Sequence, residues 1–197
     1  MHRMYSTLIE IMAAAVFIIP IWVIYNKLFF HNVKQTVVYM VFGFYLTAIL
    51  ALVGFPSITL LKVHVSVNVI PFVDMIPDFV NAFLNVLLFV PFGFFLPILW
   101  SGFRNLKSVV LAGLIATCII EMSQMFTFRT TDINDIITNT VGTIIGYFLA
   151  QRITKSFTKY TLSNSRSRDF NIICGSVVLI MLFFQPFISS LLWEMVL

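Results

Sequence analysis

The sequence predicts an all-α integral membrane protein, a polytopic bundle of six transmembrane helices. Of its 197 residues 60% are hydrophobic and only 10% are charged, whereas soluble domains carry about 45–50% apolar and about 25% charged residues. The mean hydropathy of +1.00 agrees. A bilayer accommodates this composition, because helix faces in contact with lipid must also be apolar. Six spans use about 120 residues, so we expect a single membrane domain over residues 1–197 with short loops.

Six apolar segments follow one another along the chain. They cover residues 7–25, 36–55, 80–100, 108–126, 135–150 and 170–193. The first has no small-residue cleavage site after a short apolar core, so we interpret it as a retained span rather than a signal peptide. The fifth is the shortest and most polar. Pro20 and Pro186 are expected to kink the first and last spans, as prolines in membrane helices often do.

The distribution of basic residues predicts the orientation. The loops after the first, third and fifth spans hold nine Lys and Arg residues, and the opposite side holds three. Cytoplasmic loops carry the excess of Lys and Arg, so we expect both termini to be extracytoplasmic. The same rule accounts for the net charge of +4, and no nucleic-acid partner is predicted. Trp22, Trp100 and Trp193 fall near span ends, where indole rings prefer the membrane interface.

The loop between the second and third spans alternates apolar and polar residues over 62–69. This is a strand-like period. Because unpaired strand backbone cannot lie in hydrocarbon, we expect an extended or hairpin-like segment on the outer surface. Cys118 and Cys174 lie in apolar segments without metal-ligand spacing, so both are interpreted as packing residues, and no metal or cofactor is predicted.

Polar side chains accumulate on the third, fourth and fifth spans, at the ends that this orientation places near the outer leaflet. The candidate ligand-binding residues are Asn81, Asn85, Glu121, Gln124, Arg129, Asp132, Asp135 and Asn139. Glu121 lies about 8 Å below the outer boundary of its span. A charge at a helix centre costs about 2.5–3.5 kcal/mol, so we expect Glu121, although shallower, to face protein or water rather than lipid.

Two interpretations of this cluster remain open. It forms a binding or catalytic pocket, or it is polar scaffolding in which amides join neighbouring helices and Asp135 complements the dipole of its helix. The Gly142-x-x-x-Gly146 spacing is interpreted as a close-packing motif.

The same residues carry a resemblance to a known family. They form the motifs Asn68-Val-Ile-Pro71-Phe72, Asn81-x-x-x-Asn85, Glu121-x-x-Gln124 and Arg129-x-x-Asp132-x-x-Asp135-x-x-x-Asn139-x-x-Gly142-x-x-x-Gly146. Over about residues 66–150 the chain resembles the VanZ-like family. The resemblance implies a bacterial plasma-membrane protein of the cell envelope, and the family's namesake gives low-level resistance to the glycopeptide teicoplanin. It implies no particular reaction.

Three functions fit these features. A non-enzymatic protein would bind membrane lipids, a lipid-linked cell-wall intermediate or the glycopeptide at the cluster, and so lower teicoplanin susceptibility. An intramembrane enzyme would use Glu121 as general acid or base, with Arg129 and the Asn amides holding an anionic head group. A small transporter is the third alternative. The sequence has no hydrolase or phosphate-loop motif and no inverted repeat typical of transporters.

Overall fold

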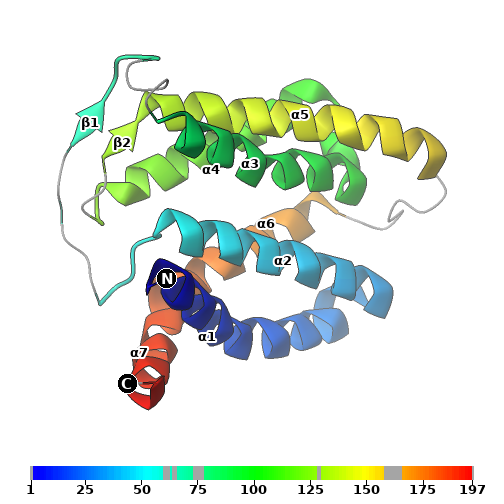
Figure 1. Cartoon of the computed structure of the whole chain (residues 1–197). Coiled ribbons are helices and arrows are strands. Elements are labelled where there is room, and N and C mark those ends of the chain that lie inside the picture. The colour runs from blue at the N-terminus through cyan, green and yellow to red at the C-terminus, as the bar shows by residue number, and fades with distance from the viewer. Residues whose placement is uncertain are drawn as a thin grey trace. The chain divides into compact units, whose positions relative to one another are not determined.

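The computed structural model describes residues 2–59, 63, 66–72, 78–127, 130–157 and 166–196, which are almost entirely helical (Figure 1). This confirms the predicted all-α class. The chain divides into two compact units. Unit 1 comprises Met1–Lys62 and Asn171–Leu197, and unit 2 comprises Val63–Phe170.

Unit 1 contains the first two helices and most of the last helical segment. Its elements are α1 (His2–Tyr25), a π-helical turn (Asn26–Phe30), α2 (Val33–Val53), α6 (Ser167–Leu179), which begins in unit 2, a second π-helical segment (Ile180–Phe184) and α7 (Gln185–Val196). Asn32 caps α2 by accepting the N–H of Gln35. Helix α1 packs on α2, where a Cβ on Gly43 would contact the Trp22 ring.

Pro186 leaves a backbone carbonyl of the last helix without its usual donor. Proline has no N–H, so the carbonyl four residues earlier, that of Leu182, receives no α-helical hydrogen bond from it. The N–H of Ile58, in the segment after α2, donates to this carbonyl at 3.0 Å. A π-helical segment ends two residues before Pro186, and the kinks predicted at Pro20 and Pro186 stay predictions.

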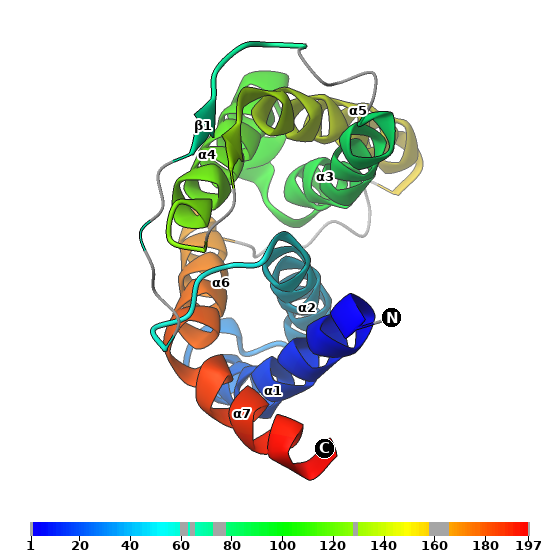
Figure 2. The same ribbon diagram turned by 60° about the vertical axis from the view of Figure 1, so that its left-hand side comes forward.

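Unit 2 is built on α3, α4 and α5, joined by short turns (Figure 2). Its elements are β1 (Val67–Asn68), α3 (Phe79–Leu99), a 3₁₀ turn (Ser101–Phe103), α4 (Leu106–Gln124), β2 (Thr131–Asp132) and α5 (Ile133–Phe157). Helices α3 and α5 approach closely because Gly142 and Gly146 face the backbone carbonyls of Val86 and Val90, where a Cβ would collide. The close-packing interpretation of the two glycines is therefore confirmed.

The predicted extended segment is found at β1, which pairs in parallel with β2. Val67 lies opposite Thr131 and Asn68 opposite Asp132. The partner strand thus comes from the loop between α4 and α5, not from a hairpin within the loop before α3. Residues 60–62, 64 and 65 lie outside the described residues.

Among the residues that the structure describes, five helical segments are long and apolar enough to cross a membrane. They are Tyr5–Phe30, Val33–Val53, Phe79–Leu99, Leu106–Gln124 and Ser167–Glu194. Helix α5 has 25 residues, a length of about 37 Å, but its polar residues lower its hydropathy. Five of the six predicted spans thus meet the criterion, and the fifth span, residues 135–150, stays a prediction.

Two of the three tryptophans near predicted span ends are covered by protein. Trp22 and Trp100 are 0% and 1% exposed. Trp100 packs edge-on against Phe103 and Phe170. The positions of Trp22 and Trp100 near span ends in the sequence could not predict that protein covers their side chains.

Candidate functional site

The end of α4 and the starts of α3 and α5 lie at one end of unit 2, beside the two-stranded pair (Figure 1), and these segments carry the predicted polar residues that the structure describes. Glu121 lies in the last turn of α4 and is only 2% exposed. Its Oε2 accepts the N–H of Asp132 at 3.0 Å, and its backbone carbonyl accepts the hydroxyl of Thr131 at 2.9 Å. The carbonyls of a last helical turn lack helical donors, so Thr131 supplies one. Glu121 therefore fastens β2 to the end of α4.

Asp132 is the N-cap of α5. Its Oδ1 accepts the N–H of Asn134 at 2.8 Å, which is the usual capping bond to the second helical residue. Its Oδ2 accepts Nδ2 of Asn68 at 3.3 Å. Predicted as a ligand-binding residue, Asp132 has a clear structural role, because it joins β1 to the start of α5.

Helices α3 and α5 are linked by a second amide–carboxylate bond. Asn85 Nδ2 donates to Asp135 Oδ1 at 2.7 Å, and Asp135 lies in the first turn of α5, where a negative charge complements the helix dipole. Asn81 does not take part in this link. It is exposed, and its Nδ2 donates to Asp78 Oδ1 at 2.6 Å at the start of its own helix.

Asn139 lies one helical turn below Asp135, in the interface between α4 and α5. It is 3% exposed, and its Nδ2 donates to the hydroxyl oxygen of Thr117 at 2.9 Å. Its Oδ1 is buried and has no hydrogen-bond partner. Buried polar groups are nearly always paired, and leaving one unpaired costs about 1–3 kcal/mol. The amide oxygen of Asn139 is thus an acceptor held in the protein interior without a donor.

Of the two remaining predicted residues, the structure describes Gln124 but not Arg129. Gln124 is 3% exposed, and its backbone carbonyl accepts the N–H of Thr127 at 2.9 Å. Arg129 lies outside the described residues. The structure thus links Asn85 with Asp135, Glu121 with Asp132, and Asn139 with α4, and leaves Asn81 apart.

Sequence reasoning missed three polar residues at the site. They are Thr117, Thr131 and Asn134. Thr117 precedes Glu121 by one helical turn, so the i, i+4 spacing placed it on the same face. Asn134 is 6% exposed, and its Oδ1 accepts the N–H of Phe72 at 2.7 Å. No sequence pattern signals that contact, because its two partners are far apart in the chain.

The charge at this end of unit 2 is predominantly negative. The carboxylates of the described residues there are those of Asp78, Glu121, Asp132 and Asp135. The Lys and Arg residues in α4 and α5 and in the turn before α4 are Arg104, Lys107, Arg152 and Lys155, the last of them in the final turn of α5. Arg104 and Lys107 lie at the opposite end of α4, and Arg152 lies in the second half of α5. Among the described residues no group of three or more His, Cys, Asp or Glu side chains could hold a metal ion.

The chain has apolar helices long enough to cross a membrane, and α3 and α4, two of them, share with α5 a buried, hydrogen-bonded polar cluster. These features define a helical membrane protein with a polar site among its helices. A family model described as VanZ/LLP1 matches residues 17–157. The match covers more than half of the chain, which therefore belongs to the VanZ/LLP1 family. It includes α2 to α5 and every candidate site residue. No curated protein and no solved structure matches the chain.

Proposed function

We propose that this chain is a bacterial cell-envelope membrane protein that binds the polar head of a lipid or lipid-linked molecule at the cluster of α3, α4 and α5. The observation that carries the proposal is the unpaired Oδ1 of Asn139, which is buried one turn below Glu121 and Asp135. A hydroxyl or N–H group of a bound molecule would supply the missing donor.

The charge balance favours a particular kind of head group. Among the described residues four carboxylates lie at this end of unit 2, and the sequence of the α4–β2 loop contributes one Arg, Arg129. Even if the positive charge of Arg129 is included, the negative charges of the carboxylates exceed it. A head group rich in hydroxyl or ammonium donors fits this balance better than an anionic one, since like charges at close range repel. This argues against the anionic head group expected for an intramembrane enzyme.

The roles of the carboxylates also favour binding over catalysis. Glu121, the candidate acid or base, accepts the backbone N–H of Asp132, and Asp132 caps α5. The first bond holds the end of α4 against β2, which leads directly into α5, and the second caps the start of α5. With the predicted orientation, the cluster would face the outer leaflet, where lipid-linked cell-wall intermediates and glycopeptides meet the membrane. Lower teicoplanin susceptibility, the property of the family's namesake, is the activity that we propose for it.

Two variants test the proposal. Asn139→Ala removes the unpaired acceptor. Thr117→Val, the matched control, removes the partner of Asn139 but keeps its Oδ1. Each full-length variant is expressed in a teicoplanin-susceptible bacterium lacking its own family member. Teicoplanin susceptibility is measured there, and thermal unfolding is measured on purified protein in detergent.

We expect Asn139→Ala to abolish protection while the unfolding temperature stays within a few degrees. Thr117→Val should lower the unfolding temperature, because it removes the hydroxyl that accepts the hydrogen bond from Asn139 Nδ2, yet retain protection. Full protection by a well-expressed Asn139→Ala variant would contradict the proposal. Equal losses of protection in the two variants, in parallel with stability, would identify the cluster as scaffolding.

A further inference from the structure

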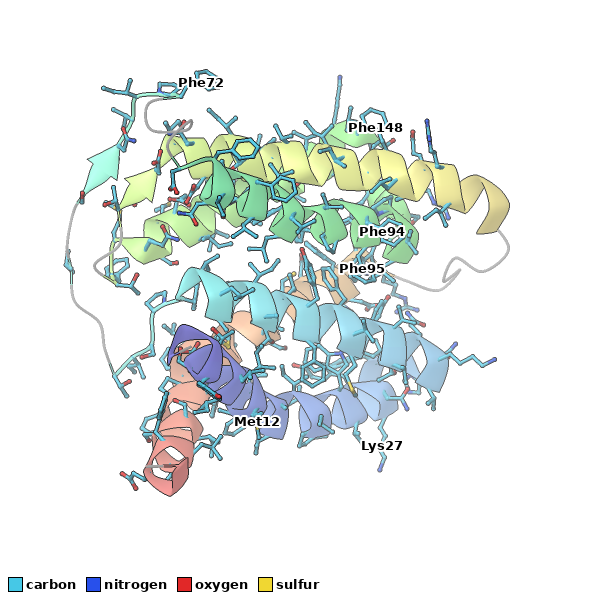
Figure 3. The ribbon with its side chains drawn as sticks, viewed as in Figure 1. Met12, Lys27, Phe72, Phe94, Phe95 and Phe148 are labelled. Atoms are coloured by element: carbon cyan, nitrogen blue, oxygen red, sulfur yellow. The ribbon has the colours of Figure 1, made fainter. Side chains whose placement is uncertain are left out.

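An exposed apolar segment projects from unit 2 beside the start of α5. It comprises Val69, Ile70, Pro71 and Phe72, and we call it the apolar tip. Val69 is 70% exposed, Ile70 59% and Phe72 66%. In Figure 3 the Phe72 side chain lies at the edge of unit 2 and points away from its helices. No residue from 66 to 72 is charged.

Hydrogen bonds on both sides hold the apolar tip in this exposed position. The N–H of Ile70 donates to Asn68 Oδ1 at 3.3 Å, and Asn68 belongs to β1. The N–H of Phe72 donates at 2.7 Å to Asn134 Oδ1, in the first turn of α5. Phe72 has a φ of 66°, a conformation that bulky residues rarely adopt. These hydrogen bonds therefore fix the backbone conformation of the tip, and this conformation directs the Phe72 ring outward.

These tethers also fix its depth relative to the membrane helices. Asn134 lies in the first turn of α5, and β1 pairs with the two residues just before that helix. The tip consequently lies level with the helix ends, where the polar and hydrocarbon regions of a bilayer meet. At the same level, the first turns of α3 expose Phe79, Val80 and Phe83 by 66%, 68% and 54%.

We propose that the apolar tip inserts into the leaflet of the bilayer that surrounds the start of α5, the outer leaflet in the predicted orientation. The absence of charge in residues 66–72, the depth set by Asn134 and the exposed apolar residues at the start of α3 on the same end of unit 2 all favour lipid as its occupant. The tip would then anchor the β1–β2 pair, and with it the end of α4, at the membrane surface. This inference does not depend on the proposed ligand site.

Site-directed spin labelling of the full-length chain tests the insertion. The native Cys118 and Cys174 are first replaced by Ser. Single cysteines are then introduced as Val69→Cys, Ile70→Cys or Phe72→Cys, and each preserves the backbone N–H groups that tether the tip. Val80→Cys on α3 is the control in lipid, and Thr130→Cys, at an exposed position before β2, is the control in water. The labelled proteins are reconstituted in vesicles of phosphatidylethanolamine and phosphatidylglycerol.

The measurement compares collisions of each label with oxygen, which partitions into lipid, and with a water-soluble nickel chelate. We expect the tip labels to resemble Val80→Cys, with oxygen accessibility severalfold higher relative to nickel than at Thr130→Cys. Nickel accessibility equal to that at Thr130→Cys would overturn the inference. Protection from both probes would overturn it too, because a protein partner or a second copy would then cover the tip. If one labelled variant fails to fold, the other two carry the same test.

Discussion

Replacing Glu121 by Gln separates the structural role of this side chain from the role of its charge. Glu121 is 2% exposed, and its Oε2 accepts the N–H of Asp132 at 3.0 Å. Glutamine has nearly the same shape and keeps an acceptor oxygen for that bond. A hydrogen bond to a charged group contributes about 1.5–3 kcal/mol and a neutral one about 0.5–1.5 kcal/mol, so the change from carboxylate to amide weakens the bond by about 1 kcal/mol. Relief of the desolvation of a buried charge offsets this loss.

We therefore expect the free energy of unfolding of Glu121→Gln to stay within about 1 kcal/mol of the parent. Glu121→Ala is the matched variant that also removes the acceptor. It leaves the Asp132 N–H without this partner, at a cost of about 1–3 kcal/mol, and opens a cavity that adds to the loss. Thermal unfolding of both full-length variants in the same detergent measures the difference.

Teicoplanin susceptibility of cells expressing Glu121→Gln then reports on the charge. Loss of protection in a variant of parental stability would show that the binding site needs the negative charge or its titratable proton. Full protection would remove Glu121 from the list of essential charged groups. The structural reasoning itself is refuted if Glu121→Gln loses as much stability as Glu121→Ala, because the acceptor oxygen would then not be what holds β2 to α4.

Three further predictions concern packing, capping and orientation. Gly142→Ala places a methyl group against the Val86 carbonyl and should destabilise the chain by about 1–3 kcal/mol; Gly175→Ala, where nothing lies within 4 Å, should be neutral or slightly stabilising in the same unfolding assay. Asp132→Ala should cost about 1 kcal/mol through loss of the cap on Asn134, whereas Asp132→Asn should retain most of that stability; equal losses would contradict the capping role. Reporter fusions should read cytoplasmic at Lys34, Lys107 and Ser163 and external at Val67 and Thr130, and a cytoplasmic reading at Thr130 would reverse the orientation.

Composition and helical spacing were sufficient to predict the membrane class and the helices of the cluster. Hydropathy predicts spans because every residue facing lipid must be apolar. Hydropathy predicts α5 less well, because Asn139, Gly142 and Thr143 face protein and lower the mean hydropathy of the helix. Helix ends were less accurate: α4 ends at Gln124, two residues before the predicted boundary, which places Glu121 closer to the helix end than expected.

Individual partners could not be predicted in the same way. Asn81 and Asn85 were both predicted as ligand-binding residues, but Asn85 donates to Asp135 of α5, whereas Asn81 donates to Asp78 at the start of its own helix. The parallel pairing of β1 with β2 joins segments separated by two membrane helices. Such contacts depend on how the helices pack in three dimensions, and the local spacing of residues does not contain that information.

The bond between Ile58 and Leu182 has a consequence for how the chain enters the membrane. When the last helix is synthesised, the Leu182 carbonyl has no donor from Pro186, and an unsatisfied backbone group in hydrocarbon costs several kcal/mol. Its donor, the N–H of Ile58, was made much earlier and lies just after α2. The final helix should therefore integrate stably only after the first two helices are in place, and a fragment that begins after Ile58 should be recognised by membrane quality control despite the high hydropathy of its last span.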